Sequence, residues 1–342
     1  MGRTLVERAA AGIRIATLKL MGAINGRDMP IQGVDMPIQS DVCIPSDEID
    51  AFNFNSAHRW IYNKLLVARS QGLECGLHDA APSRYPVFCK PVINLRGMGA
   101  GSCILFSERD YQAKCGVGDF WMRVLTGEQI STDFAIVRGE IAWCRHTLAI
   151  PAEAGTFDYW VVEERPRPRL ERYCAAWIGA NLTAYTGMLN LETIGGRIID
   201  AHLRFSDQWA DLYGRKWSDA VARLYQHGSW DLIDAERAEG YSVVLFGPHG
   251  QAYAYPDPDL MTGYQRTVGI SSIQLTFSED RPLDDHAMPP GGFRLAVINC
   301  FNLDVGLRIR AAMAREFGLP AETYRRRTPS ASFSANALSV WL

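Results

Sequence analysis

Hydrophobic positions recur along the chain with two different periods, and these periods predict which segments are strands and which are helices. Alternating or continuous apolar residues bounded by Gly and Pro predict strands, whereas apolar positions three and four residues apart predict helices. The predicted strands are 85–95, 102–106, two in 129–150, two in 190–205, 240–247 and 291–301, and the predicted helices are 56–72, 107–114, 168–187, 217–228 and 304–318. Strands come in hairpins separated by helices, which favours an α+β fold over a doubly wound parallel sheet.

Capping residues mark two of the helix starts. Ser56 is the predicted N-cap of helix 56–72, which Gly72 would end. Ser107 followed three residues later by Asp110 has the pattern of a capping box. The direct repeat DMPIQGVDMPIQ at 28–39 contains two prolines and no helical period, so it is predicted to be an extended loop.

A glycine-rich segment, NLRGMGAGSC, lies between the strands predicted at 85–95 and 102–106. No lysine follows its last glycine and a strand comes next, which excludes a P-loop and a dinucleotide fingerprint. A glycine-rich loop between antiparallel strands is typical of a flap whose backbone N–H groups close over phosphates. Lys90, on the preceding strand, would add a positive charge there. A flexible hairpin tip without a ligand is the alternative.

The segment NLETIGGRIIDAHLRF predicts a hairpin with many ionisable side chains. The Gly-Gly pair by itself indicates a two-residue turn, which would mix charged and apolar residues on each face. A three-residue loop at 195–197 instead separates the faces, and the hydrophobic pattern sets register. The apolar face then holds Leu189, Leu191, Thr193, Ile199, Ala201, Leu203 and Phe205. The polar face holds Asn190, Glu192, Asp200, His202 and Arg204.

The polar face of this hairpin predicts a cation site. Glu192 would lie opposite Asp200, and paired carboxylates repel one another unless a cation neutralises them. Mg²⁺ or Mn²⁺ with bound phosphates would do so. The alternative is a ladder of salt bridges within the hairpin, with Arg197 and Arg204 as the cations.

Composition narrows the class of protein. The 342 residues are 47% hydrophobic and 21% charged, as in a soluble globular protein, and the net charge of −3 gives no electrostatic basis for nucleic-acid binding. No run approaches the roughly 18 apolar residues of a membrane helix. The basic N-terminus lacks the apolar core of a secretory signal, and a mitochondrial presequence is the alternative to an opening helix and strand. Eight scattered cysteines without a C-x-x-C motif indicate buried thiols and a cytoplasmic protein.

Four segments, taken in order, resemble motifs of the ATP-grasp superfamily. NKLLVARSQGL resembles the helix that starts the module, and YPVFCKPVINLRGMGAGSCILFSERDY resembles the Lys-Pro pair before the glycine-rich flap. LTGEQISTDFAIVRGEIAW is similar to the strand pair with a Gly-x-Glu motif, here shortened to Gly127-Glu128. LNLETIGGRIIDAHLRF resembles the signature N-x-E … E-x-N-P-R. The resemblance spans roughly residues 56 to 300.

The resemblance implies an ATP site. Lys90 would contact ATP phosphate or adenine, Lys64 would lie near the entrance of the module, and Glu128 would lie near the ribose. The flap residues implied to contact the nucleotide are Gly97, Gly99, Gly101 and Ser102.

The resemblance also implies a catalytic and metal-binding group on the hairpin. Glu192 and Asp200 would hold Mg²⁺ or Mn²⁺, with His202 at the place of the usual ligand asparagine. Arg204 matches the motif's arginine and, with Lys90, would stabilise charge on the transferring phosphoryl group. Asp200 is shorter than the usual glutamate, and a nitrogen ligand at His202 suits Mn²⁺ better than Mg²⁺.

The implied function is an ATP-dependent ligase that activates a carboxylate as an acyl phosphate, which an amine or another nucleophile then attacks. Its partners would be small molecules, with no nucleic acid and no membrane, and a homodimer remains open. Two alternatives are a nucleotide-binding relic without catalysis and a phosphotransferase. The implied divisions are a shortened N-terminal region (1–55), a subdomain with the flap (56–125), a subdomain with the metal hairpin (126–324) and a disordered tail (325–342).

Overall fold

The computed structural model describes residues 42–320, apart from 96–98, 153–155, 236, 287–288 and 290. The repeat at 28–39, Gly97 of the flap and the tail predicted at 325–342 lie outside the described residues. No helix in the described part of the chain is both long and apolar enough to span a bilayer. The eight cysteines are all free thiols.

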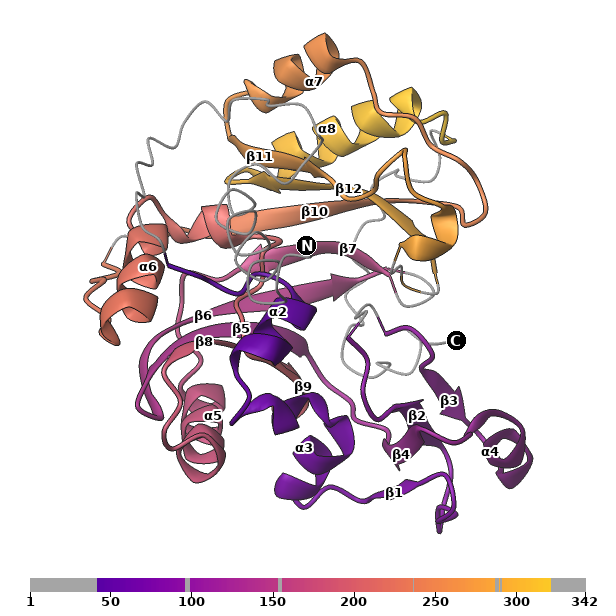
Figure 1. Ribbon diagram of the computed structural model, residues 1–342. Helices are drawn as coiled ribbons and strands as arrows, with labels where there is room; N and C mark the ends of the chain where they lie inside the picture. Colours follow the sequence, from indigo (N-terminus) through magenta and orange to yellow (C-terminus); the bar gives the residue numbers. More distant parts are fainter. Residues whose placement is uncertain are drawn as a thin grey trace, which may run out of the picture.

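Two antiparallel sheets organise the protein, which confirms the predicted α+β class (Figure 1). The small sheet has the order β1-β4-β2-β3, with strands β1 (Cys75–Leu77), β2 (Val87–Pro91), β3 (Cys103–Leu105) and β4 (Asp119–Arg123). The large sheet has the order β11-β12-β10-β7-β6-β5-β8-β9. Its strands are β5 (Gln129–Val137), β6 (Glu140–Pro151), β7 (Phe157–Val162), β8 (Gly187–Ile194), β9 (Arg197–His202), β10 (Gly240–Gly247), β11 (Ile270–Leu275) and β12 (Phe293–Cys300).

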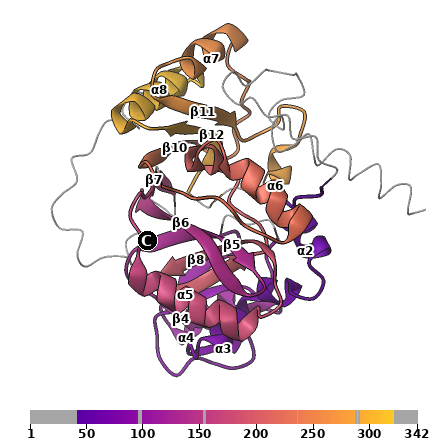
Figure 2. The same cartoon turned by 90° about the vertical axis from the view of Figure 1, so that its left-hand side faces the viewer.

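Helices cover the large sheet on both faces. The α-helices are α2 (Glu48–Phe54), α3 (Lys64–Ser70), α4 (Glu108–Lys114), α5 (Pro168–Asn181), α6 (Trp217–His227), α7 (Pro258–Gln265) and α8 (Leu303–Glu316), and the short 3-10 helices are η1 (Arg59–Tyr62), η2 (Ala210–Tyr213) and η3 (Leu283–Asp285). Figure 2 shows α5 lying across the strands of the lower half, where it packs on a core from β5, β8 and β9. α8 packs on β10 and β12, and α6 with η2 packs on the opposite face of the sheet.

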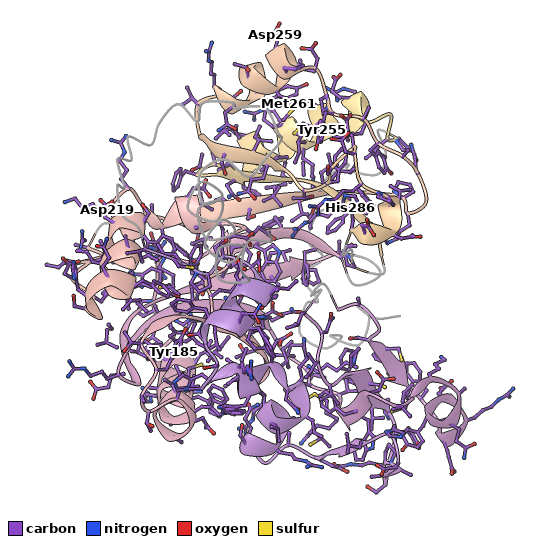
Figure 3. The ribbon with its side chains drawn as sticks, in the orientation of Figure 1. Tyr185, Asp219, Tyr255, Asp259, Met261 and His286 are labelled. Carbon is purple, nitrogen blue, oxygen red and sulfur yellow. The ribbon has the colours of Figure 1, made fainter. Side chains whose placement is uncertain are left out.

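Separate hydrophobic clusters stabilise the two ends of the large sheet. Figure 3 places Tyr185 in the lower cluster with α5, whereas Tyr255 and Met261 lie in the upper cluster with α8. Burial of these apolar side chains is the main force that holds the layers together. Helix α3 contacts both β9 of the large sheet and β1 of the small sheet, so it joins the two sheets at their boundary.

The predicted helix at 56–72 is wrong in its first half, because the chain there is divided into η1 and α3. Ser56 is therefore not the N-cap: Asn63 is, and its side chain accepts a hydrogen bond from Leu66 N at 3.0 Å. Gly72, with φ of 68°, follows the end of α3 as expected. The helix start at Ser107 is confirmed, since its hydroxyl accepts a hydrogen bond from Asp110 N.

The predicted three-residue hairpin loop is also wrong. Ile194 pairs directly with Arg197, so the turn consists of Gly195 and Gly196 alone, with φ of 55° and 75°. Two positive φ angles are what a type I′ turn requires, and glycine adopts them at little cost. The Gly-Gly pair was therefore the better guide to the turn.

A β-bulge in β9 brings Glu192 opposite Asp200, the pairing that the predicted three-residue loop would have produced. Thr193 pairs with Ile198, and the next pair along the ladder is Glu192 with Asp200, so Ile199 is the extra residue. Ile198, at 1% exposure, takes the core position predicted for Ile199. The bulge thus lets a two-residue turn and a segregated polar face coexist, and the prediction that Glu192 and Asp200 share one face is confirmed.

Candidate functional site

The polar face of the β8–β9 hairpin meets two lysines at the boundary between the sheets. Lys64, the first residue of α3, forms an ion pair with Asp200, and both side chains are largely buried. Lys90 of β2 donates a hydrogen bond from Nζ to the carbonyl of Ile199 at 2.6 Å. That carbonyl belongs to the bulge residue, so the irregularity of β9 also supplies the acceptor for Lys90.

The three predicted metal ligands converge. His202 Nε2 lies 3.8 Å from Asp200 Oδ1 and 3.9 Å from Glu192 Oε1. Strand geometry explains the convergence, because Glu192 and Asp200 are opposite one another and His202 is two residues along the same strand. The donor set of two carboxylates and one imidazole fits a divalent ion such as Mg²⁺ or Mn²⁺.

Protein cations neutralise Asp200 more completely than Glu192. Burial opposes the ionised form of Asp200, but the charges of Lys64 and His202 outweigh it and lower the pKa of that carboxyl. Burial raises the pKa of Glu192, and the negative charge of Asp200 adds to that effect despite the attraction of His202. The two carboxyls of the pair therefore differ in proton affinity, as expected of neighbouring acids in one buried site.

The lysines also respond to their surroundings. Burial opposes the charge on Lys64, but Asp200 outweighs it and raises the pKa of the ammonium group. Burial, with the nearby charge of Lys64, lowers the pKa of Lys90 to about 8. Lys64 is thus a fixed counter-ion, whereas Lys90 is a buried cation that an anionic ligand would stabilise.

Glu48 completes the site, and the sequence analysis missed it. Its Oε1 lies 2.8 Å from His202 Nδ1, 2.5 Å from Arg204 Nη2 and 3.1 Å from Arg204 Nε. Burial opposes ionisation of Glu48, but the charges of His202 and Arg204 lower its pKa to about 2. Burial alone would lower the pKa of His202, but the negative charges of Glu48 and Asp200 outweigh burial and raise that pKa. Glu48 is one of two acids in the first turn of α2, so no sequence signal marks it.

Neither cation of the predicted salt-bridge ladder binds the paired carboxylates. Arg204 binds Glu48, and Arg197 lies over the ring of Tyr173 at 5.2 Å. The partners of the hairpin's charges therefore come from α2 and α3, far away in the sequence, rather than from the hairpin itself.

The described flap residues, Gly99, Gly101 and Ser102, occupy the predicted loop between β2 and β3. These strands are antiparallel, with Cys89 opposite Cys103. Gly99 and Gly101 have φ of 64° and 78°, and Ser102 N donates to Gly99 O at 3.0 Å. Alternation of left-handed glycines with other residues can aim successive backbone N–H groups into one concavity, which is how a backbone loop binds phosphate.

Glu128, implied to lie near the ribose, lies beside the hairpin turn. Its carbonyl accepts a hydrogen bond from Gly195 N at 3.0 Å, while its exposed carboxylate pairs with Arg167 at 2.7 Å. The contacts found for the described residues do not join Glu128 to the cluster of Asp200 and Lys64.

A further group of buried polar side chains lies beside the hairpin, on the same face of the sheet. Asp133 of β5 accepts hydrogen bonds from Asn190 Nδ2 (2.7 Å), Ser206 N (2.9 Å) and Tyr213 Oη (2.6 Å), and burial raises its pKa to about 6. These bonds fix the segment after Arg204 against the sheet. Gln208, in the same segment, accepts a hydrogen bond from Arg294 Nη1 at 3.2 Å.

Comparison with solved structures identifies the fold. No protein-family model and no curated protein matches the sequence. The structure is similar to an L-amino acid ligase from Bacillus licheniformis, with a TM-score of 0.51, 11% identity and coverage of 78% of this chain and 72% of the ligase. It is similar to a phosphoribosylamine–glycine ligase from Thermotoga maritima, with a TM-score of 0.53, 14% identity and coverage of 80% and 83%.

A third similar structure contains nucleotide. It is the carboxyaminoimidazole ribonucleotide synthase of Aspergillus clavatus complexed with ATP, with a TM-score of 0.52, 12% identity and coverage of 78% of this chain and 74% of the synthase. Identities at this level show the fold alone. The resemblance inferred from four short motifs is confirmed at that level: this chain has the ATP-grasp fold.

Proposed function

We propose that the protein is an ATP-dependent ligase that activates a carboxylate as an acyl phosphate and transfers the acyl group to an amine or another nucleophile. The observation that carries the proposal is the convergence of Glu192, Asp200 and His202 beside Lys64 and Lys90, at the boundary of the two sheets. Two proteins of similar fold are named ligases of amino-acid or amine substrates, and a third holds ATP.

ATP would bind between the flap and the hairpin. Backbone N–H groups of residues 99–101 would donate to the phosphates, and Lys90 would donate hydrogen bonds from its ammonium group to them in place of the Ile199 carbonyl. Glu192, Asp200 and His202 would hold the divalent ion, which neutralises charge on the phosphates when it is bound. Arg204, held by Glu48, would stabilise the oxygens of the transferring group.

The reaction balances as two displacements. A carboxylate oxygen of the acid attacks the γ-phosphorus of ATP, the bond to the β–γ bridging oxygen breaks, and ADP leaves. The nucleophile then attacks the acyl carbon, inorganic phosphate leaves, and the amine loses a proton. Arg294, half-buried on β12 within electrostatic reach of Arg204 and Asp207, would orient the acid, because a guanidinium can bind a carboxylate through two hydrogen bonds.

Hydroxylamine gives a test that does not require the natural nucleophile. A panel of carboxylic acids is incubated with ATP, Mg²⁺ or Mn²⁺ and hydroxylamine, and the hydroxamate and ADP are measured together. We expect one acid class to give both products in equal amounts, and Asp200→Asn to abolish both, while Glu164→Gln, an exposed acid, retains them. Formation of AMP instead of ADP would contradict the acyl-phosphate route.

One observation favours a nucleotide-binding protein without ligase activity as the second candidate. Lys64 already neutralises Asp200, so a divalent ion must share that carboxylate with a buried ammonium group. This candidate predicts ATP binding with no hydroxamate from any acid. A phosphotransferase would release ADP and leave a stable phosphorylated product, again without hydroxamate.

A further inference from the structure

A second group of metal-binding side chains lies on the opposite face of the large sheet. Cys144 and His146 alternate along β6, so both point to the same face, and Glu171 lies in the first turn of α5, which covers that face. His146 contacts Thr132 of β5, whereas the neighbouring Ser131 contacts Asn190 on the face of the candidate ATP site. The two groups are therefore separated by the sheet.

We propose that Cys144, His146 and Glu171 bind a zinc ion between β6 and α5. One donor atom from each residue lies within 4.8 Å of the other two, and His146 Nε2 lies 2.9 Å from Glu171 Oε1. Ligands at ordinary zinc distances in a tetrahedral site are about 3.2–3.8 Å apart, so only small side-chain movements are needed. Thiolate with imidazole selects zinc over the hard ions expected at the hairpin.

The surroundings hold the ligands in the orientation that zinc requires. His146 Nδ1 lies 2.9 Å from Thr132 Oγ1, so in the Nδ1–H tautomer of the metal-bound imidazole this N–H would donate to that hydroxyl and leave the Nε2 lone pair for the ion. The backbone N–H of Arg167 donates to Glu171 Oε1 at 2.9 Å and orients the carboxylate. Such outer hydrogen bonds to ligating His and Glu are usual at zinc centres.

Access from solvent is retained on one side of the site. The side chain of His146 is fully buried, but that of Glu171 is 28% exposed. An ion can therefore enter past Glu171, and a water molecule can take the fourth position of the tetrahedron. Because α5 carries one ligand and β6 carries two, the ion would tie the helix to the sheet and stabilise the folded state.

Metal content and a cobalt spectrum test the proposal. The full chain, without a polyhistidine tag and purified without chelator, is analysed for zinc by mass spectrometry and then reloaded with Co²⁺. We expect a stoichiometry near one zinc per chain and an absorption band from thiolate-to-cobalt charge transfer. The band separates this site from the hairpin, because Glu192, Asp200 and His202 include no sulfur.

Variants assign the band to these residues. Cys144→Ala is expected to remove the zinc and the band, whereas Cys103→Ala, at another partly buried cysteine, should keep both. Glu171→Gln alters a partly exposed side chain, so it tests the site even if Cys144→Ala does not fold. Wild-type protein with neither zinc nor a cobalt–thiolate band, or Cys144→Ala protein that keeps its zinc, would overturn the proposal and leave His146 as a hydrogen-bonded link between β5 and α5.

Discussion

Replacing Glu48 with Gln tests the electrostatic organisation of the hairpin site. The carboxylate lies within 2.8 Å of His202 and 2.5 Å of Arg204, and its side chain is only 10% exposed. Gln has nearly the same shape but no charge, so the variant leaves two buried cationic groups without their anion. Breaking a buried ion pair on one side is costly because the remaining charge is uncompensated.

The pKa of Glu48 sets the magnitude. A carboxyl whose pKa falls from 4.5 to about 2 on folding contributes about 3 kcal/mol at neutral pH. Because the folded-state pKa is depressed, this contribution is complete well above pH 4.5 and is lost as pH falls toward the folded pKa. At about pH 3.5 the contribution should be about 2 kcal/mol. The gap between wild type and Glu48→Gln must therefore narrow in acid.

Urea denaturation followed by circular dichroism, in buffer with chelator, measures that gap at each pH. The exposed Glu164, whose side chain is 48% accessible, provides the matched control. Glu164→Gln should change the free energy of unfolding by no more than about 0.5 kcal/mol. A Glu48→Gln loss below about 1 kcal/mol at neutral pH, or a gap that stays constant into acid, would refute the reasoning.

Three further predictions concern the same region. Lys90→Ala should weaken ATP binding by about 1–3 kcal/mol, the scale of a charged hydrogen bond, and unchanged affinity by calorimetry would remove Lys90 from the site. His202→Asn should shift the metal preference of ATP turnover from Mn²⁺ toward Mg²⁺. Glu48 and Asp200 raise the pKa of His202 above the usual imidazole value of 6.5. The Mn²⁺-dependent activity of wild type should therefore begin to fall above pH 6.5 as the pH is lowered. Identical pH profiles in wild type and His202→Asn would show that His202 is not a ligand. Gly195→Ala should lower the free energy of unfolding by more than about 2 kcal/mol, because the added Cβ would lie 2.2 Å from Thr126 O. Gly196→Ala, whose Cβ would meet open space, should lower it by about 1 kcal/mol. Equal losses in the two variants would contradict the two-glycine turn.

Local pattern was sufficient to predict most elements and the residues on the polar face of the hairpin. Glu192, Asp200 and His202 converge because strand periodicity and cross-strand pairing are short-range rules. The turn was predicted incorrectly because periodicity was applied without allowing a bulge at Ile199. A bulge changes which residue faces the core while leaving the sequence pattern ambiguous. The break between η1 and α3 was missed for a related reason, since the apolar period continues through Asn63.

What the sequence could not reveal is which charges neutralise the hairpin. Clustered carboxylates predicted a cation, and the nearest cations along the chain were Arg197 and Arg204. In the structure Lys64 pairs with Asp200, 136 positions away in the sequence. Glu48 contacts Arg204, 156 positions away, and also His202. Such pairing depends on where α2 and α3 dock, and docking is decided by apolar burial rather than by charge pattern. A divalent ion at the hairpin must therefore compete with the protein's own cations. An ion at Asp200 must bind beside Lys64, and an ion at His202 must displace a proton that Glu48 helps to retain.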